Sequence, residues 1–147
     1  MRSIWFSLIE TTVKEVEQAL LELEAEQLGP GRWNFPKGTE TVLYISCTEY
    51  EWVNELGLRD EYEELLVAIG GQKPSVGLSV DVSGRHPGDD EVRLISQFLL
   101  NRFKGFAFDD YLAYSHAWTL EEILSGVKVN GLHFFDYQGY FEKTKKF

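Results

Sequence analysis

One short segment in the middle of the chain gathers residue types that could do acid–base or metal chemistry. Residues 81–90 read Asp-Val-Ser-Gly-Arg-His-Pro-Gly-Asp-Asp, so a carboxylate is followed by a guanidinium, an imidazole and two further carboxylates. Carboxylates and imidazoles suit a divalent metal or general acid–base catalysis, and loops at strand ends often carry sites. The candidate polar cluster takes side chains from this segment and from a later turn: Asp81, Arg85, His86, Asp89 and Asp109. Such a cluster would make the protein a small metal-assisted hydrolase.

A structural interpretation of the same segment is favoured. Asp89 and Asp90 suit the N-terminus of a helix, where they cap it and complement its dipole. No His-Glu-x-x-His spacing occurs, and His116 and His133 lie among aromatic residues, which is typical of histidines in a core or at its rim. The single cysteine, Cys47, follows an apolar run and is expected to be a small core residue. We therefore expect no catalytic residue, no metal ligand and no cofactor, with the hydrolase as the alternative.

The charge of the chain is distributed unevenly. Residues 1–66 contain fourteen acidic and five basic residues, a net charge of −9, whereas residues 67–147 contain ten acidic and nine basic residues, a net charge of −1. A strongly acidic surface repels the phosphates of nucleic acids and attracts basic partners. The sequence therefore argues against nucleic-acid binding and favours a basic protein partner.

Several aromatic residues adjoin the acidic residues of the first half. Acidic side chains around exposed Trp and Tyr would form a recognition patch for a basic protein. The candidate partner-binding residues are Glu17, Glu24, Trp33, Glu49, Tyr50, Glu51, Trp52 and Glu55. A glutamate-rich face can also be a solvated face that only keeps a protein in solution, and this alternative stays open.

The pattern of elements predicts one α+β domain over residues 1–147. The expected sheet is mixed and mostly antiparallel, with about four helices packed against it; a doubly wound α/β fold is second, because its usual Gly-rich phosphate loop is missing. We expect strands at 3–9, 41–47, 75–83 and near 106–108, and helices after Thr12, Asp60, Asp89 or Asp90, and Thr119. Residues 30–40 are expected to form a loop, 49–55 a strand or loop, and 132–141 a final strand or hairpin.

Part of the second half has a familiar texture. The segments Val80–Asp90, Phe108–Tyr111 and His116–Ile123, within residues 76–141, resemble small bacterial immunity-type proteins of polymorphic or contact-dependent toxin systems. The resemblance implies a cytoplasmic, non-enzymatic inhibitor that neutralises a toxin domain by binding it. It carries over no individual binding residue.

The charge agrees with this implication, because toxins that act on nucleic acid are often basic and an acidic inhibitor associates with them quickly. No apolar stretch is long enough for a signal peptide or a transmembrane helix, which also favours the cytoplasm and no membrane contact. The sequence leaves open whether the protein is a monomer, a homodimer or a structural subunit of a larger assembly.

Overall fold

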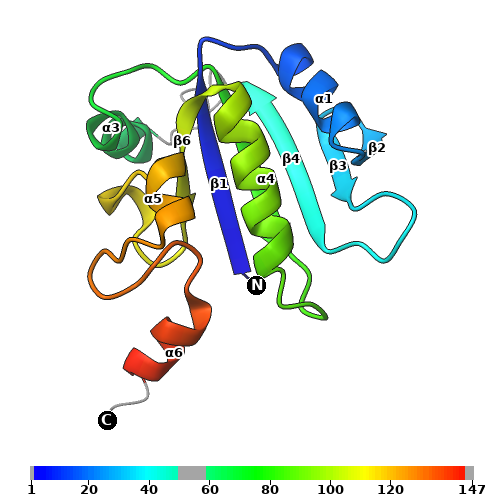
Figure 1. Cartoon of the computed structure of the whole chain (residues 1–147). Helices are drawn as coiled ribbons and strands as arrows, with labels where there is room; N and C mark the ends of the chain where they lie inside the picture. Colours follow the sequence, from blue (N-terminus) through cyan, green and yellow to red (C-terminus); the bar gives the residue numbers. More distant parts are fainter. Residues whose placement is uncertain (1, 50–58, 145–147) are drawn as a thin grey trace.

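A six-stranded antiparallel sheet, in the order β2-β3-β4-β5-β1-β6, organises the chain (Figure 1). The computed structural model describes residues 2–49 and 59–144, without the side chains of 59–62 and 143–144. The strands are β1 (Arg2–Ile9), β2 (Glu26–Gly29), β3 (Arg32–Phe35), β4 (Leu43–Glu49), β5 (Val76–Val82) and β6 (Lys104–Asp109). The helices are α1 (Val13–Glu22), α3 (Arg59–Ala68), α4 (Asp89–Arg102), α5 (Leu120–Ser125) and α6 (Tyr137–Thr144), with a 3₁₀ turn η1 (Ala113–Ser115). The predicted α+β class is confirmed.

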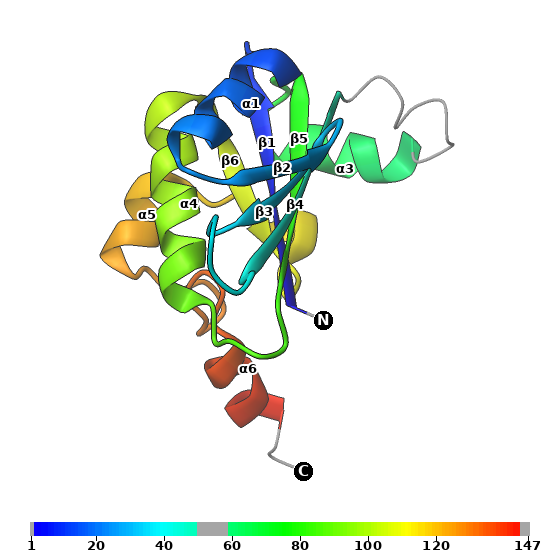
Figure 2. The ribbon, with the colours of Figure 1, turned by 90° about the vertical axis from the view of Figure 1, so that its right-hand side faces the viewer.

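The helices lie on both faces of the sheet. In the edge-on view of Figure 2, α1, α4 and α5 cover one face and α3 lies against the other. The core under α1 and α4 is built by alternate strand residues, such as Phe6 of β1, which pairs with Leu78 of β5 on one side and Ala107 of β6 on the other. A smaller core beneath α3 contains Leu65 and Phe108. No helix among the described residues is long and apolar enough to cross a membrane.

Strand β5 shows why the alternating pattern was informative. Val76, Leu78, Val80 and Val82 are buried toward the helices. The residues between them, such as Ser79, lie on the opposite face of the sheet, because successive side chains of a strand point to opposite sides. The predicted strand 75–83 is therefore confirmed to within one residue at each end.

Two predicted segments are wrong. Residues 30–40 were expected to be a loop, but β3 pairs with β4 there, because Trp33 and Phe35 alternate onto the core opposite Ile45 and Leu43. The chain around 132–141 was expected to form a strand or hairpin, but it forms α6, since the Asp136 carboxylate accepts the backbone N–H of Gly139 and so caps the first helical turn.

The helix starts were predicted with mixed success. Thr12 and Thr119 cap α1 and α5 as expected, each accepting the N–H of a glutamate three residues later. Asp60 lies within α3, which already begins at Arg59, and α4 begins after Gly88, so that Asp89 lies in the first turn without capping it. Most of the expected segment 49–55 lies outside the described residues.

Candidate functional site

The predicted polar cluster does not form in the fold. Asp81 lies on the sheet face and accepts a hydrogen bond from the Ser3 hydroxyl. Arg85 and His86 instead lie beside Glu40, with Nη1 of the arginine 3.3 Å and Nε2 of the histidine 3.5 Å from its carboxylate oxygens. The histidine contact lacks hydrogen-bond geometry. The members near the turn are thus paired with residues outside the predicted set.

The other two members lie elsewhere. Asp89 is exposed in the first turn of α4, where its charge complements the helix dipole. Asp109 is only 2% exposed and accepts the backbone N–H groups of Leu112 at 3.1 Å and Phe135 at 3.3 Å. Burial raises the pKa of the Asp109 carboxyl, and these backbone hydrogen bonds oppose that rise. Asp109 therefore ties two loop segments together.

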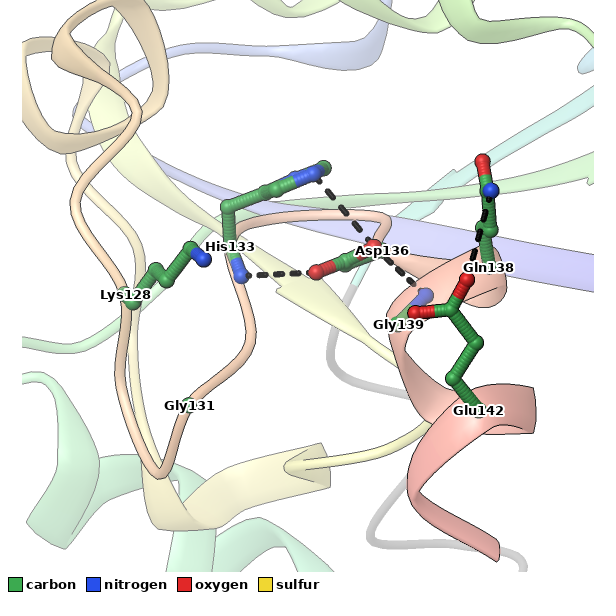
Figure 3. A pocket seen from close by; sticks show the side chains of 7 residues that line it. All are labelled: Lys128, Gly131, His133, Asp136, Gln138, Gly139 and Glu142. Carbon is green, nitrogen blue, oxygen red and sulfur yellow. Dashed lines mark hydrogen bonds and ion pairs between the residues drawn. The ribbon is translucent and has the colours of Figure 1, made fainter. Parts of the chain in front are cut away.

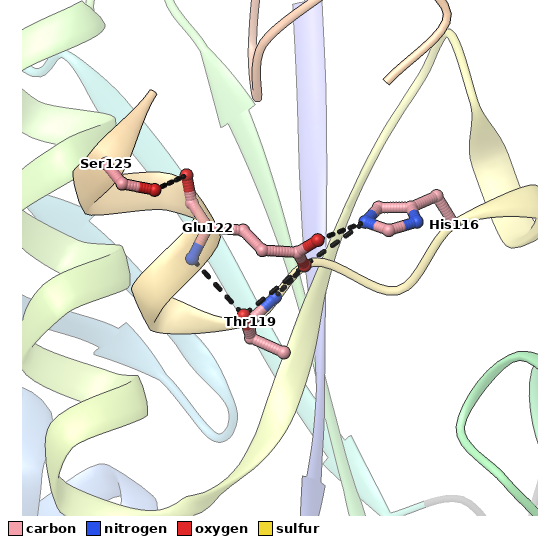
Figure 4. A network of polar contacts seen from close by, with 4 residues as sticks. All are labelled: His116, Thr119, Glu122 and Ser125. Atoms are coloured by element: carbon pink, nitrogen blue, oxygen red, sulfur yellow. Dashed lines mark hydrogen bonds and ion pairs between the residues drawn. The ribbon is translucent and has the colours of Figure 1, made fainter. Parts of the chain in front are cut away.

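The histidines of the second half support local structure. His116 Nε2 lies 3.1 Å from both carboxylate oxygens of Glu122, whose carboxylate also accepts the N–H of Thr119 in the capping box of α5 (Figure 4). The imidazole packs edge-on against Trp118, with ring centroids 4.6 Å apart. Among the described residues, no three His, Cys, Asp or Glu side chains are grouped as a metal ion would require.

His133 lies at a shallow pocket of about 500 Å³ near the start of α6 (Figure 3). Its Nδ1 lies 3.0 Å from the Phe134 carbonyl and its Nε2 3.4 Å from the Asp136 carboxylate. Lys128, Gln138 and Glu142 complete the polar lining. Because Asp136 already accepts the backbone N–H of Gly139, the central carboxylate of this pocket serves to hold the turn before α6.

Cys47 is buried in β4, as expected. Burial raises the pKa of its thiol to about 12, and the charge of Glu17 adds to that effect. The nucleophilic form of cysteine is the thiolate, so this side chain is an inert core residue near neutral pH.

Trp33 cannot serve as a surface anchor, because only 1% of it is exposed. Its indole N–H donates to the Glu17 carboxylate at 2.9 Å, and that carboxylate also accepts from the backbone N–H of Gly31 and the side chain of Gln27. Glu17 therefore fastens α1 to the β2–β3 hairpin. These two members of the candidate partner-binding set hold the fold together.

Other members of that set remain on the surface. Glu24 and Glu49 are exposed, whereas Tyr50, Glu51, Trp52 and Glu55 lie outside the described residues. Glu24 follows the C-terminus of α1, and Glu26 opens the edge strand β2 next to it. Among the described residues, neither of these two carboxylates has an ion-pair partner. We call Glu22, Glu24 and Glu26 the acidic edge; Glu22 forms an ion pair with Arg102 of α4.

The turn that carries Glu24 has an unusual residue at its key position. The N–H of Ala25 donates to the Leu20 carbonyl and that of Glu24 to the Leu21 carbonyl, which are the two hydrogen bonds of a Schellman motif. Glu24 takes the left-handed conformation, with φ 68°, at a position where glycine is usual. A glutamate there costs backbone strain, which glycine would avoid.

Beside the acidic edge lies an open groove of about 690 Å³. It is lined mostly by apolar side chains from the end of α1, the end of β3 and the outer face of α4: Leu21, Leu23, Glu24, Ala25, Phe35, Pro36, Lys37 and Leu94. We call it the leucine groove, because Leu21 and Leu94 line it and are 53% and 48% exposed.

The groove was not predicted from the sequence, although the sequence places a leucine outside the buried face of each of the two helices. The predicted buried stripe of the first helix runs through Val16, Leu20 and Leu23, so Leu21 lies off it and points elsewhere. Leu94 likewise lies outside the inner face of α4, which carries Val92. No sequence pattern could reveal that the two leucines line the same groove.

Comparison of the chain with protein-family models, with curated proteins and with solved structures found no match. The candidate site therefore stands on its geometry and charge alone.

Proposed function

We propose that this protein is a non-enzymatic binding protein that takes a basic protein partner on its acidic edge and leucine groove. The observation that carries the proposal is the combination of exposed Leu21 and Leu94 with the carboxylates of Glu24 and Glu26, which have no ion-pair partner among the described residues. Protein interfaces commonly have an apolar centre and a polar rim, and complementary charge on that rim steers the encounter of the partners. The acidic edge would therefore favour a positively charged partner and increase its association rate.

Within this class, we propose an immunity protein that neutralises a basic bacterial toxin in the cytoplasm, a nuclease being the toxin type that fits best. Two observations support this role. The segments within 76–141 resemble immunity-type proteins, and a net charge of −10 complements a protein that must bind polyanionic nucleic acid.

The strained backbone conformation of Glu24 also supports a role for its carboxylate in binding. Replacing Glu24 by glycine would relieve the strained turn, yet the chain carries a carboxylate there. Strained backbone positions cluster at active sites, ligand-binding sites and switch regions. A role for the Glu24 carboxylate in partner binding explains why the chain bears this cost.

The test is co-expression with the product of the adjacent gene. We expect the protein to protect cells from that product and to bind it in a calorimetric titration. Glu24→Gln with Glu26→Gln should weaken binding about tenfold, corresponding to about 1.4 kcal/mol. The matched control is Glu64→Gln with Glu121→Gln, which removes the same charge from exposed positions on α3 and α5 and should leave affinity within about twofold.

Two results would overturn the proposal. One is the absence of binding to any basic product of a neighbouring gene or to a basic protein recovered with this chain from its host. The other is equal loss of affinity in the two double variants, which would assign the effect to net charge and not to the acidic edge.

A further inference from the structure

The leucine groove is suited to bind an apolar side chain. Leu21 and Leu94 line it from two different helices, and Phe35, the buried last residue of β3, also belongs to the lining. Its volume of about 690 Å³ falls within the roughly 300–1,000 Å³ of ordinary ligand pockets. Half-exposed leucines at such a groove would lose contact with water when a partner covers them, which favours binding.

The charges around the groove indicate the kind of partner. Glu24 lines the groove itself, and Glu26 follows it at the start of β2. Lys37 is the one cation in the lining described for the groove. The two carboxylates of Glu24 and Glu26 outweigh the single charge of Lys37, and a basic segment is complementary to them.

A second copy of this chain fits the groove poorly. Each copy carries a net charge of −10, so two copies repel one another over the distance of their approach. A basic partner meets no such barrier.

We propose that the leucine groove takes one apolar side chain, of leucine or phenylalanine type, from a basic segment of the partner whose Lys or Arg residues lie against Glu24 and Glu26. The inference rests on the proposed function and deepens it by giving the carboxylates and the groove separate roles in binding. The carboxylates act on the association rate, because charge steers the encounter, whereas the groove acts on the dissociation rate, because apolar burial is made only after docking.

The contribution of the groove can be measured as a difference in affinity between two synthetic peptides. The first is an amphipathic peptide of lysine and leucine, and the second has every leucine replaced by glutamine at the same charge. We expect wild-type protein to bind the leucine peptide at least about tenfold more tightly, the effect of burying one apolar side chain. This leucine preference should persist at high salt, where the binding of the glutamine peptide is lost.

The decisive variant is Leu21→Gln with Leu94→Gln. Both side chains are about half exposed, so the fold should be kept, which a thermal melt would verify. The matched control is Val67→Gln on α3, where the side chain is 82% exposed. We expect the leucine preference to disappear in the groove variant and to remain in the control.

Each outcome bears on a different part of the account. Loss of the leucine preference in the groove variant alone supports the groove as the anchor site. Equal binding of the two peptides by wild-type protein overturns the groove but leaves the acidic edge in place. Failure of both peptides to bind at low salt overturns the proposed function together with the groove. Concentration-dependent self-association that the groove variant abolishes would assign the groove to a second copy and overturn the inference.

Discussion

Two groups of carboxylates in this chain have opposite surroundings. At the acidic edge, Glu24 and Glu26 are exposed and have no ion-pair partner among the described residues. In the second half, Asp109 accepts backbone N–H groups from two loops, Glu122 holds the start of α5, and Asp136 holds the start of α6. The carboxylates of the second set accept hydrogen bonds from backbone N–H groups that would otherwise lack an acceptor, and they therefore stabilise the fold.

The contrast separates acids that hold the fold from acids that are free to meet a partner. Glu17 shows that this division does not follow the halves of the sequence. It lies in the acidic half, yet its carboxylate accepts three hydrogen bonds, one from the indole of Trp33. Net charge alone would have grouped Glu17 with Glu24, whereas their contacts assign them different roles.

The largest expected effect comes from removing Asp109. Asp109→Ala removes the acceptor of the part-buried N–H of Leu112 and of the buried N–H of Phe135, at about 1–3 kcal/mol for each group left unsatisfied. We expect the free energy of unfolding to fall by about 3 kcal/mol in a urea titration. Glu26→Gln, at the acidic edge, should change it by less than about 0.5 kcal/mol. Equal effects of the two variants would contradict the comparison.

Glu17→Ala should have the next largest effect. The variant removes the acceptor of the Trp33 indole N–H and of the Gly31 backbone N–H, and we expect a loss of about 1–2 kcal/mol in stability. The fluorescence of the tryptophans, measured under native conditions, should also change as Trp33 loses its partner. A Glu17→Ala protein as stable as the wild type would place Glu17 back among the free surface acids.

Glu24→Gly should act in the opposite direction. Glycine adopts the left-handed conformation of residue 24 without strain, although it also makes the unfolded chain more flexible. We expect a net gain of about 0.5–1 kcal/mol in the free energy of unfolding, together with weaker binding of the partner. If stability rises and binding is unchanged, the Glu24 carboxylate has no part in recognition.

The smallest expected effect is the pH dependence that Asp109 gives to the stability of the fold. Burial raises the folded-state pKa of Asp109 above its unfolded value, so the folded protein takes up this proton first as the pH falls. The ionised group costs stability above the folded pKa, and that cost disappears as the pH drops toward the unfolded pKa. We therefore expect the stability of the wild type, relative to Asp109→Asn, to rise between neutral pH and about pH 4. A difference that stays constant or falls would contradict this sign.

Much of the fold could be predicted from local patterns. The alternation in β5 and the capping box of Thr119 and Glu122 are written in neighbouring residues, and both are present in the structure. The β2–β3 hairpin was missed because β3 is only four residues long and gains its stability by pairing with β4. Short strands of this kind depend on distant partners more than on their own sequence.

The candidate site was predicted only in part. The sequence predicted an acidic surface around the aromatic residues Trp33, Tyr50 and Trp52. Trp33 is buried, and the other two lie outside the described residues. The exposed apolar residues of the groove are Leu21 and Leu94, which are 73 positions apart in the chain and line it together because α1 and α4 cover the same face of the sheet. Burial of an aromatic residue beside acids is decided by tertiary contacts, which composition does not contain.

The most direct test of the central claim is the association rate of the basic partner, measured by stopped-flow at several salt concentrations. For the wild type, the account predicts a rate that falls steeply as salt rises, because screening weakens the attraction of the acidic edge. Glu24→Gln with Glu26→Gln should lower the rate at low salt and flatten its salt dependence, whereas Glu64→Gln with Glu121→Gln should keep most of both. A wild-type rate that is indifferent to salt would contradict the claim.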